Sequence, residues 1–243
     1  MKKSTRIVLI ILIPFVLITA SVGGFFIYVN DYYKADDIAL SALESDDLVK
    51  VTHVDDKYYI FEPIEVSNKA FVFIPGGKVE AKAYAPLMRE VAKKGFVCIL
   101  LEVKFNLAII DQNAPLGIQS DFSNIDTWII GGHSLGGTVA SMYLAKHQDE
   151  YSGIVFLGSY PQSDLSSLDI KSVVIYGTED KVLNMEKFES SKQKWPKATN
   201  VNVIEGGNHA QFGSYGAQKG DGTATIAASE QWAIVADQLA LLL

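Results

Sequence analysis

The sequence WIIGGHSLGGTVA places one serine between two pairs of glycines. Ser134 has Gly132 two residues before it and Gly136 two residues after it, which is the G-x-S-x-G spacing. A strand pattern over 127–130 precedes this motif, and a helical pattern over 135–148 follows it. A sharp strand-to-helix turn lifts a serine hydroxyl above the edge of a sheet, where side chains at the glycine positions would collide with the strand and the helix. The motif therefore predicts a nucleophilic serine.

A serine hydroxyl is a poor nucleophile unless a base takes its proton, and the chain has four histidines. His209 lies in EGGNHAQF, in a loop that directly follows an apolar strand pattern. His133 lies inside the serine motif and is expected to point elsewhere. His147 is expected to be solvated at a helix end, and His53 lies in a predicted hairpin. We therefore predict that His209 is the base.

The base needs an acidic partner that fixes its tautomer and stabilises the imidazolium. The segment YGTEDKV follows the strand pattern KSVVIY and offers Glu179 and Asp180. We predict that Asp180 is the acid and that Glu179 faces solvent, while Asp221 is interpreted as a turn residue. The resulting chain order is Ser134, Asp180, His209, with each residue placed after a separate predicted strand.

Two backbone N–H groups are candidates to bind the negative charge that develops on a reacting oxygen. The N–H of Leu135 lies at the start of a predicted helix, where the helix dipole favours an anion. The stretch IPGGKV follows an earlier strand pattern, and Gly76 and Gly77 would let the backbone approach a substrate closely. We favour the Gly77 N–H as the second donor, with an ordinary turn as the alternative.

Short apolar runs alternate with helical patterns along most of the chain. The expected strands cover residues 48–54, 57–63, 70–75, 96–103, 127–130, 153–158, 171–177 and 199–206, and the expected helices cover 81–94, 135–148, 184–194 and 224–242. The first two strands are predicted to form a hairpin. The alternation predicts an α/β fold, with a mostly parallel sheet and helices on both faces. Functional groups then collect at the carboxyl ends of the strands.

The N-terminal region predicts a membrane anchor. Residues 7–29 contain no charge, and a helix of that length spans roughly 34 Å, enough to cross a hydrocarbon core. Lys2, Lys3 and Arg6 precede the span and favour a cytoplasmic N-terminus with the domain outside the cell membrane. The alternative is a cleaved signal peptide and a secreted protein. The expected order is a basic end over 1–6, the anchor over 7–29, a linker over 30–46 and a catalytic domain over 47–243.

The composition excludes some partners. The 243 residues include 28 Asp and Glu against 21 Lys and Arg, a net charge of −7, which argues against nucleic-acid binding. Cys98 is the single cysteine, so the chain cannot form an internal disulfide, and its apolar surroundings predict a buried thiol. We expect no metal and no cofactor, and the sequence leaves the oligomeric state open.

Taken together, these stretches resemble the α/β-hydrolase superfamily over residues 48–243, and most of all its compact, dienelactone-hydrolase-like members. The resemblance rests on FIPGGKVEAKAYAPLMRE, GGHSLGG, YGTEDKV and GGNHAQFGSYG. It implies a nucleophile at Ser134, an acid at Asp180, a base at His209 and oxyanion donors at Gly77 and Leu135. The chain departs from many members in the stretch Pro75-Gly76-Gly77, which contains the Gly77 donor, because His-Gly is frequent there.

The implied reaction is hydrolysis of a small carboxylic ester or a related acyl substrate through an acyl-enzyme. Thioesters, lactones, peptides and acyl transfer remain open, and a catalytically idle scaffold used for binding at the cell surface is the alternative. No lid domain is expected, because only residues 159–170 separate two predicted strands. Five residues near predicted strand ends are weaker candidates for the substrate pocket, and each is equally consistent with packing: Phe105, Asn106, Tyr160, Phe212 and Tyr215.

Overall fold

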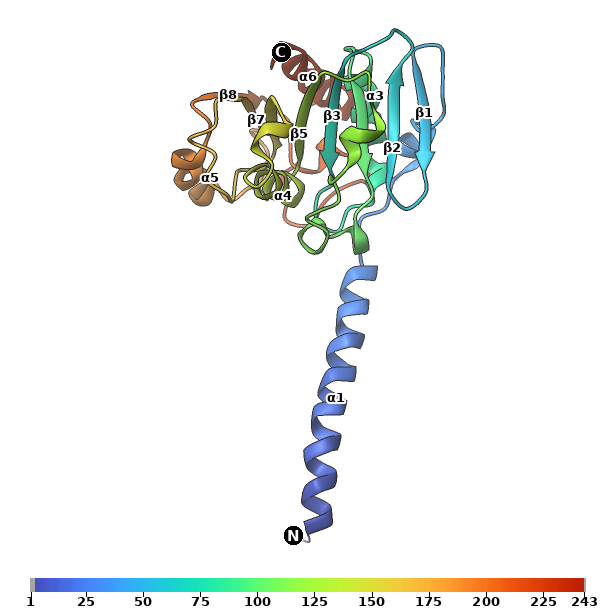
Figure 1. The fold of residues 1–243 in the computed structure, drawn as a ribbon, viewed down its shortest axis with the longest axis vertical. Helices are drawn as coiled ribbons and strands as arrows, with labels where there is room; N and C mark the ends of the chain where they lie inside the picture. The colour runs from blue at the N-terminus through green and yellow to red at the C-terminus, as the bar shows by residue number, and fades with distance from the viewer. Residues whose placement is uncertain (1–2, 243) are drawn as a thin grey trace. The chain divides into compact units, whose positions relative to one another are not determined.

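The computed structural model describes residues 3–242, and the chain divides into two units between Tyr32 and Tyr33. The first unit contains helix α1, Lys3–Asn30 (Figure 1). Its segment Ile13–Asn30 has a mean hydropathy of 1.7 and is long and apolar enough to cross a membrane. A signal sequence near an N-terminus has the same properties. Pro14 lies inside this helix, and membrane helices tolerate proline.

The second unit is built on one eight-stranded sheet with the order β1-β2-β4-β3-β5-β6-β7-β8. Strand β1 is antiparallel to β2, and β2 is antiparallel to β4, while the remaining neighbouring pairs of this sheet are parallel. The predicted hairpin and mostly parallel sheet are therefore confirmed. The strands are β1 (Val49–Val54), β2 (Tyr58–Pro63), β3 (Lys69–Ile74), β4 (Val97–Leu101), β5 (Thr127–His133), β6 (Gly153–Leu157), β7 (Lys171–Gly177) and β8 (Ala198–Ile204).

Helices cover both faces of the sheet (Figure 1). The α-helices are α2 (Asp37–Ser41), α3 (Ala85–Ala92), α4 (Leu135–Leu144), α5 (Met185–Ser191) and α6 (Ala228–Leu242). The 3-10 turns are η1 (Ala81–Tyr84), η2 (Lys104–Asn106), η3 (Ala108–Ile110), η4 (Ile118–Asp121), η5 (Gln148–Glu150), η6 (Lys192–Lys194) and η7 (Ala210–Phe212). Because side chains alternate along a strand, Phe71 and Phe73 pack with α3 and α6, whereas Val72 and Ile74 pack with α4 and α5. The two apolar cores fix the strand ends that carry the predicted site.

Several elements differ in extent from the prediction, and for two of them the sequence supplies the reason. The helix expected over 81–94 begins as the 3-10 turn η1, and α3 starts only where Pro86 occupies its first turn, a position that suits proline. The strand expected over 127–130 continues as β5 through both glycines to His133. A Cβ at Gly131 would come within 2.8 Å of the Val155 side chain, so glycine allows the neighbouring strand to lie close.

Residues 33–46, which belong to the expected linker over 30–46, pack on the sheet unit. We call this segment the N-terminal strap. It contains α2, in which Ala39 is fully buried. Leu43 packs against the core on the side of α3 and α6. The polar composition of the segment indicated a connector, yet its few apolar side chains are enough to dock it.

The strap begins with a short parallel bridge between Tyr33 and Val79. The Tyr33 N–H donates to the carbonyl oxygen of Lys78 at 2.8 Å, and the N–H of Glu80 donates to the Tyr33 carbonyl at 2.9 Å. The strap is thereby bonded to the loop that follows β3.

Asp36 joins the strap to a second loop. Its N–H donates to the carbonyl of Ser214 at 3.0 Å, and its carboxylate accepts the Ser214 hydroxyl at 2.8 Å. The same carboxylate caps α2 by accepting the N–H of Ala39 at 3.0 Å, which satisfies a donor that the helix leaves unpaired. The strap therefore bridges the loops that follow β3 and β8.

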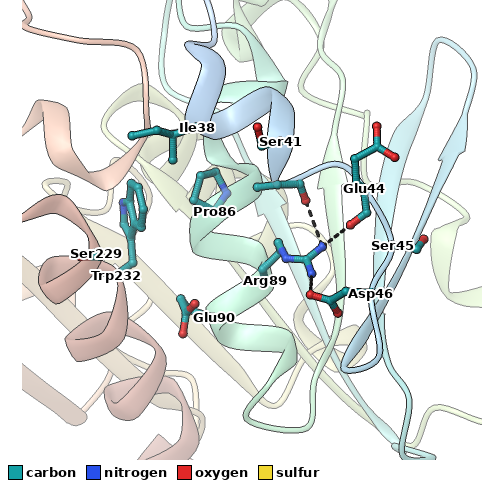
Figure 2. Close-up of a pocket in the computed structure, with 11 residues that line it drawn as sticks. Ile38, Ser41, Glu44, Ser45, Asp46, Pro86, Arg89, Glu90, Ser229 and Trp232 are labelled. Atoms are coloured by element: carbon teal, nitrogen blue, oxygen red, sulfur yellow. Dashed lines mark hydrogen bonds and ion pairs between the residues drawn. The ribbon is translucent and has the colours of Figure 1, made fainter.

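The end of the strap is held by Arg89 of α3 (Figure 2). The guanidinium donates to the carbonyl oxygens of Ala42 at 3.2 Å and Glu44 at 2.5 Å, and it pairs with the Asp46 carboxylate. These residues line a hollow of about 430 Å³, which Trp232 of α6 borders from the other side. None of the predicted site residues lines this hollow, and Arg89 acts there as a clamp on the backbone.

Candidate active site

Ser134 lies in the sharp turn between β5 and α4, with φ 50° and ψ −119°. A non-glycine residue in this region is strained by about 1–3 kcal/mol and stays there only where its surroundings hold it. The Ser134 N–H donates to the carbonyl of Leu157 at 2.9 Å, and the Ser159 hydroxyl donates to the Ser134 carbonyl at 2.6 Å. Both partners lie at the end of β6, so the adjacent strand fixes the turn.

The glycines on either side of Ser134 are required by close backbone contacts. A Cβ at Gly136 would collide with the carbonyl oxygen of Ile74, and a Cβ at Gly132 would collide with the same oxygen and with the backbone of Gly136. The end of β3 therefore lies directly against the turn. This contact explains the residue types in the motif, and the half-buried serine stands at the carboxyl edge of the sheet.

His209 and Asp180 form a buried pair in the loops that follow β8 and β7. The Nδ1 atom of His209 lies 2.8 Å from Oδ2 of Asp180, and both side chains are at most 1% exposed. The other carboxylate oxygen, Oδ1, accepts the N–H groups of Val182 at 2.9 Å and Leu183 at 2.8 Å. Because a carboxylate accepts, Nδ1 of the neutral ring is the donor, and the lone pair of the ring lies on Nε2.

The Nε2 atom of His209 is buried and has no hydrogen-bond partner among residues 3–242. Buried polar atoms are nearly always paired, and the few exceptions among the described residues, which include Nε2 of both His209 and His133, require an explanation. A ring nitrogen with a free lone pair is what a general base presents to a proton.

Gly158 and Ser159 connect the serine turn to the His–Asp pair. Ser159 bonds the carbonyl of Ser134, and the adjacent Gly158, with φ +50°, lies against the pair. A Cβ at Gly158 would come within 2.8 Å of His209 Nδ1 and 3.1 Å of Asp180 Oδ2. The three residues predicted from three distant segments thus lie around one two-residue turn at the end of β6.

The other two candidate acids have different surroundings. The carboxylate of Glu179 is 36% exposed and lies 3.8 Å from the Lys181 ammonium group. Asp221, interpreted as a turn residue, accepts the N–H of Ala210 at 2.8 Å and the N–H of Lys181 at 3.2 Å. Asp221 therefore ties the loop of His209 to the loop of Asp180. The flanking glycines of KGDGT signalled a turn and gave no sign of this role.

The predicted oxyanion donors lie side by side. A Cβ at Gly77 would come within 2.9 Å of Cδ2 and 3.4 Å of Cβ of Leu135. Within the described residues, no hydrogen bond engages the N–H of Gly77 or of Leu135. The neighbours of Gly77 are fixed, because the Gly76 N–H donates to the Tyr84 hydroxyl at 3.0 Å and the Lys78 N–H donates to the Asn106 carbonyl at 2.7 Å.

Two of the pocket candidates, Phe105 and Asn106, lie beside this glycine turn. The Asn106 carbonyl binds the N–H of Lys78, and the Phe105 side chain is 45% exposed. Both residues have a positive φ, 56° and 52°. They remain candidates for a pocket wall.

The three other pocket candidates lie elsewhere. Tyr160 borders a hollow of about 180 Å³ formed with α5 and the residues after it. Phe212 is fully buried, and Tyr215 is only 8% exposed and packs its ring on Tyr33. Phe212 and Tyr215 therefore pack in the core here, as apolar residues in a strand-end loop commonly do, and their place in a substrate pocket stays a prediction.

His133 does not point away from the site. Its ring is 1% exposed, and its centroid lies 4.3 Å from that of His209. Its Nδ1 atom lies 2.8 Å from the hydroxyl of Tyr84. Burial in this apolar environment holds the pKa of His133 well below its usual value, and the neighbouring His209 lowers it further.

Comparison with known proteins identifies the fold family. The model of the alpha/beta hydrolase family matches residues 70–233, which include every strand from β4 to β8 and the three predicted reacting residues. The chain belongs to the alpha/beta hydrolase family. The strand order of this α/β-hydrolase and the resemblance seen in its sequence are consistent with that assignment.

Solved structures share the fold of this α/β-hydrolase at low sequence identity. A predicted CIB-like hydrolase from Thermoplasma acidophilum aligns with a TM-score of 0.58 and 15% identity, over 80% of this chain and 99% of that one. A dienelactone hydrolase from Anabaena variabilis aligns at 0.57 and 13%, over 80% and 96%. Est1E from Butyrivibrio proteoclasticus, with ferulic acid bound, aligns at 0.55 and 12%, over 82% and 98%. The comparison with curated protein sequences gave no match.

Proposed function

We propose that this α/β-hydrolase cleaves a small carboxylic ester, or a related acyl substrate, with Ser134 as nucleophile, His209 as base and Asp180 as acid. The observation that carries the proposal is the buried His209–Asp180 pair at the same sheet edge as the glycine-framed serine, with Nε2 of His209 unpaired within residues 3–242. A solvent-exposed or fully paired histidine would give no such support.

In the proposed reaction, the Ser134 hydroxyl attacks the carbonyl carbon while Nε2 of His209 accepts its proton. Asp180 holds the ring in the required tautomer. The N–H groups of Gly77 and Leu135 bind the oxyanion that forms, which is the step where preorganised donors contribute most. The alcohol then leaves with the proton from His209, and water attacks the acyl-enzyme with His209 again acting as base. The carboxylic acid is released and the Ser134 hydroxyl is restored.

A fluorophosphonate probe tests this chemistry directly, because it phosphonylates only a serine that a base activates. The full-length chain should become labelled at one position, and mass spectrometry should locate the label on Ser134. A folded chain that takes up no label would support the idle-scaffold alternative instead.

The segment between β6 and β7 favours short acyl substrates. Residues 158–170 contain neither a helix nor a strand, so this described stretch supplies no helical lid to cover a long acyl chain. We expect kcat/KM on p-nitrophenyl esters to be highest for acetate or butyrate and to fall by about tenfold or more towards dodecanoate, since added methylenes find no apolar cover. Initial rates below the micellar concentration of each ester measure this, and a maximum at dodecanoate would contradict it.

We also propose that α1 anchors the protein in a membrane, with the catalytic unit on the extracytoplasmic side. The support is the apolar segment Ile13–Asn30 together with the cations that precede it, Lys2, Lys3 and Arg6. The chain should stay in the membrane pellet after carbonate extraction and should keep its N-terminal residues in an intact mass spectrum. Release with a shortened mass would indicate a cleaved signal peptide.

A further inference from the structure

Tyr84 and His133 are two buried polar side chains that lie next to the proposed active site and contact each other. The proposed reaction uses neither of them. Tyr84 is fully buried and His133 is 1% exposed. The Tyr84 hydroxyl oxygen lies 2.8 Å from Nδ1 of His133, and it accepts the N–H of Gly76 at 3.0 Å. Because the oxygen accepts from Gly76, its own hydrogen is available to the ring nitrogen. The neutral ring of His133 then carries its proton on Nε2.

This pair fills the space between the glycine turn and the base. A Cβ at Gly76 would come within 2.7 Å of the Tyr84 hydroxyl and 2.9 Å of His133 Nδ1, so the turn lies directly on the pair. On its other side, the His133 ring lies 4.3 Å from the His209 ring and 5.3 Å from the Phe212 ring, between centroids. One side chain of the pair therefore contacts the turn next to Gly77, and the other contacts the proposed base.

The charge state of the pair suits that location. Burial lowers the pKa of His133 well below its usual value, so the ring is neutral at neutral pH. A second cationic ring beside His209 would oppose the imidazolium that forms when the base takes a proton. Burial also raises the pKa of Tyr84, which keeps its hydroxyl protonated and able to donate.

We propose that Tyr84 and His133 are positioning residues, which hold the Gly76–Gly77 turn where the Gly77 N–H meets the oxyanion and support the ring of His209. This inference rests on the proposed function and names two further residues for it. A phenyl ring at position 84 would fill the same volume. However, it would leave both the Gly76 N–H and His133 Nδ1 without a partner in a buried site, and unpaired buried groups drive a local rearrangement.

The test is the kinetics of Tyr84→Phe on p-nitrophenyl acetate in the full-length chain. We expect kcat to fall about 10- to 100-fold, because a displaced oxyanion donor weakens binding of the transition state, while KM changes less than about threefold. Tyr143→Phe is the matched control. Tyr143 is also buried, and its hydroxyl contacts Glu150 at 3.2 Å within the core on the side of α4 and α5. Its kcat should stay within about twofold of wild type.

A second pair of variants separates positioning from packing. His133→Asn keeps a side-chain acceptor near the place of Nδ1, whereas His133→Leu removes it. We expect kcat of the asparagine variant to exceed that of the leucine variant by about tenfold. Equal losses in the two variants, or an unchanged kcat in Tyr84→Phe, would overturn the proposal.

Fluorophosphonate labelling of wild type, run in parallel, distinguishes a failure of the positioning role from a failure of the proposed function. If wild type is labelled at Ser134 and kcat of Tyr84→Phe equals that of wild type, only the positioning role is wrong. If wild type takes up no fluorophosphonate label, the proposed function is wrong, and so is the positioning role that rests on it.

Discussion

Ser134→Ala is expected to remove hydrolysis of p-nitrophenyl acetate, with kcat lowered by about 10⁴-fold or more, while the fold is kept. The loss follows because the hydroxyl is the atom that forms the acyl-enzyme. The fold should survive because no hydrogen bond within residues 3–242 involves the Ser134 hydroxyl. The contacts that hold the turn use the backbone N–H and carbonyl of this residue, and alanine retains both.

Fluorophosphonate labelling and steady-state kinetics measure this effect together. Ser167→Ala is the control, because Ser167 is exposed in the segment between β6 and β7, and its label and rate should match wild type. Persistent labelling of Ser134→Ala would show that another serine reacts. If the wild-type chain and both variants hydrolyse the ester equally, the assigned nucleophile is wrong.

Asp180→Asn is expected to lower kcat by about 10⁴-fold through the wrong tautomer of the base. The local geometry makes this outcome specific. Oδ1 of Asp180 accepts two N–H groups, from Val182 and Leu183, so an asparagine would keep its carbonyl oxygen there. Its NH₂ group would then face Nδ1 of His209 and donate to it. The proton of the neutral ring would move to Nε2, where it blocks the abstraction of the serine proton.

Glu179→Gln is the matched control for this prediction. The two acids are adjacent in sequence, but the Glu179 carboxylate is 36% exposed and faces Lys181, whereas the Asp180 side chain is fully buried. We expect kcat of Glu179→Gln to stay within about twofold of wild type. A larger loss from Glu179→Gln than from Asp180→Asn would reassign the acid.

The parts of the site that the sequence predicted are those with a strong local signal. Ser134 is flanked by glycines, and such a cluster indicates a backbone too crowded for side chains. The strand patterns before Asp180 and His209 placed both residues at strand ends. Parallel pairing then brings those ends to one edge of the sheet, although the residues are far apart in the chain. Knowledge of the strand order adds little to that argument, because every parallel strand ends at the same edge.

The parts that the sequence missed depend on contacts between distant segments. The strap looked like a linker because its partners, Val79 and Ser214, are far away in sequence. The side chain of His133 follows the alternation of its strand, yet the partner it meets, Tyr84, lies 49 positions earlier in the chain. Asp221 had the composition of a turn, and its bond to the N–H of Ala210 becomes visible only in three dimensions.

The docking of residues 33–46 sets a limit on how the catalytic unit can be shortened. A shortened version that starts at the boundary suggested by composition, residue 47, would lose the backbone partner of Glu80 and the carboxylate that binds Ser214. The guanidinium of Arg89 would also lose its three oxygen partners, on Ala42, Glu44 and Asp46. A version intended for crystallisation or enzymology without helix α1 therefore has to begin at Tyr33 or earlier.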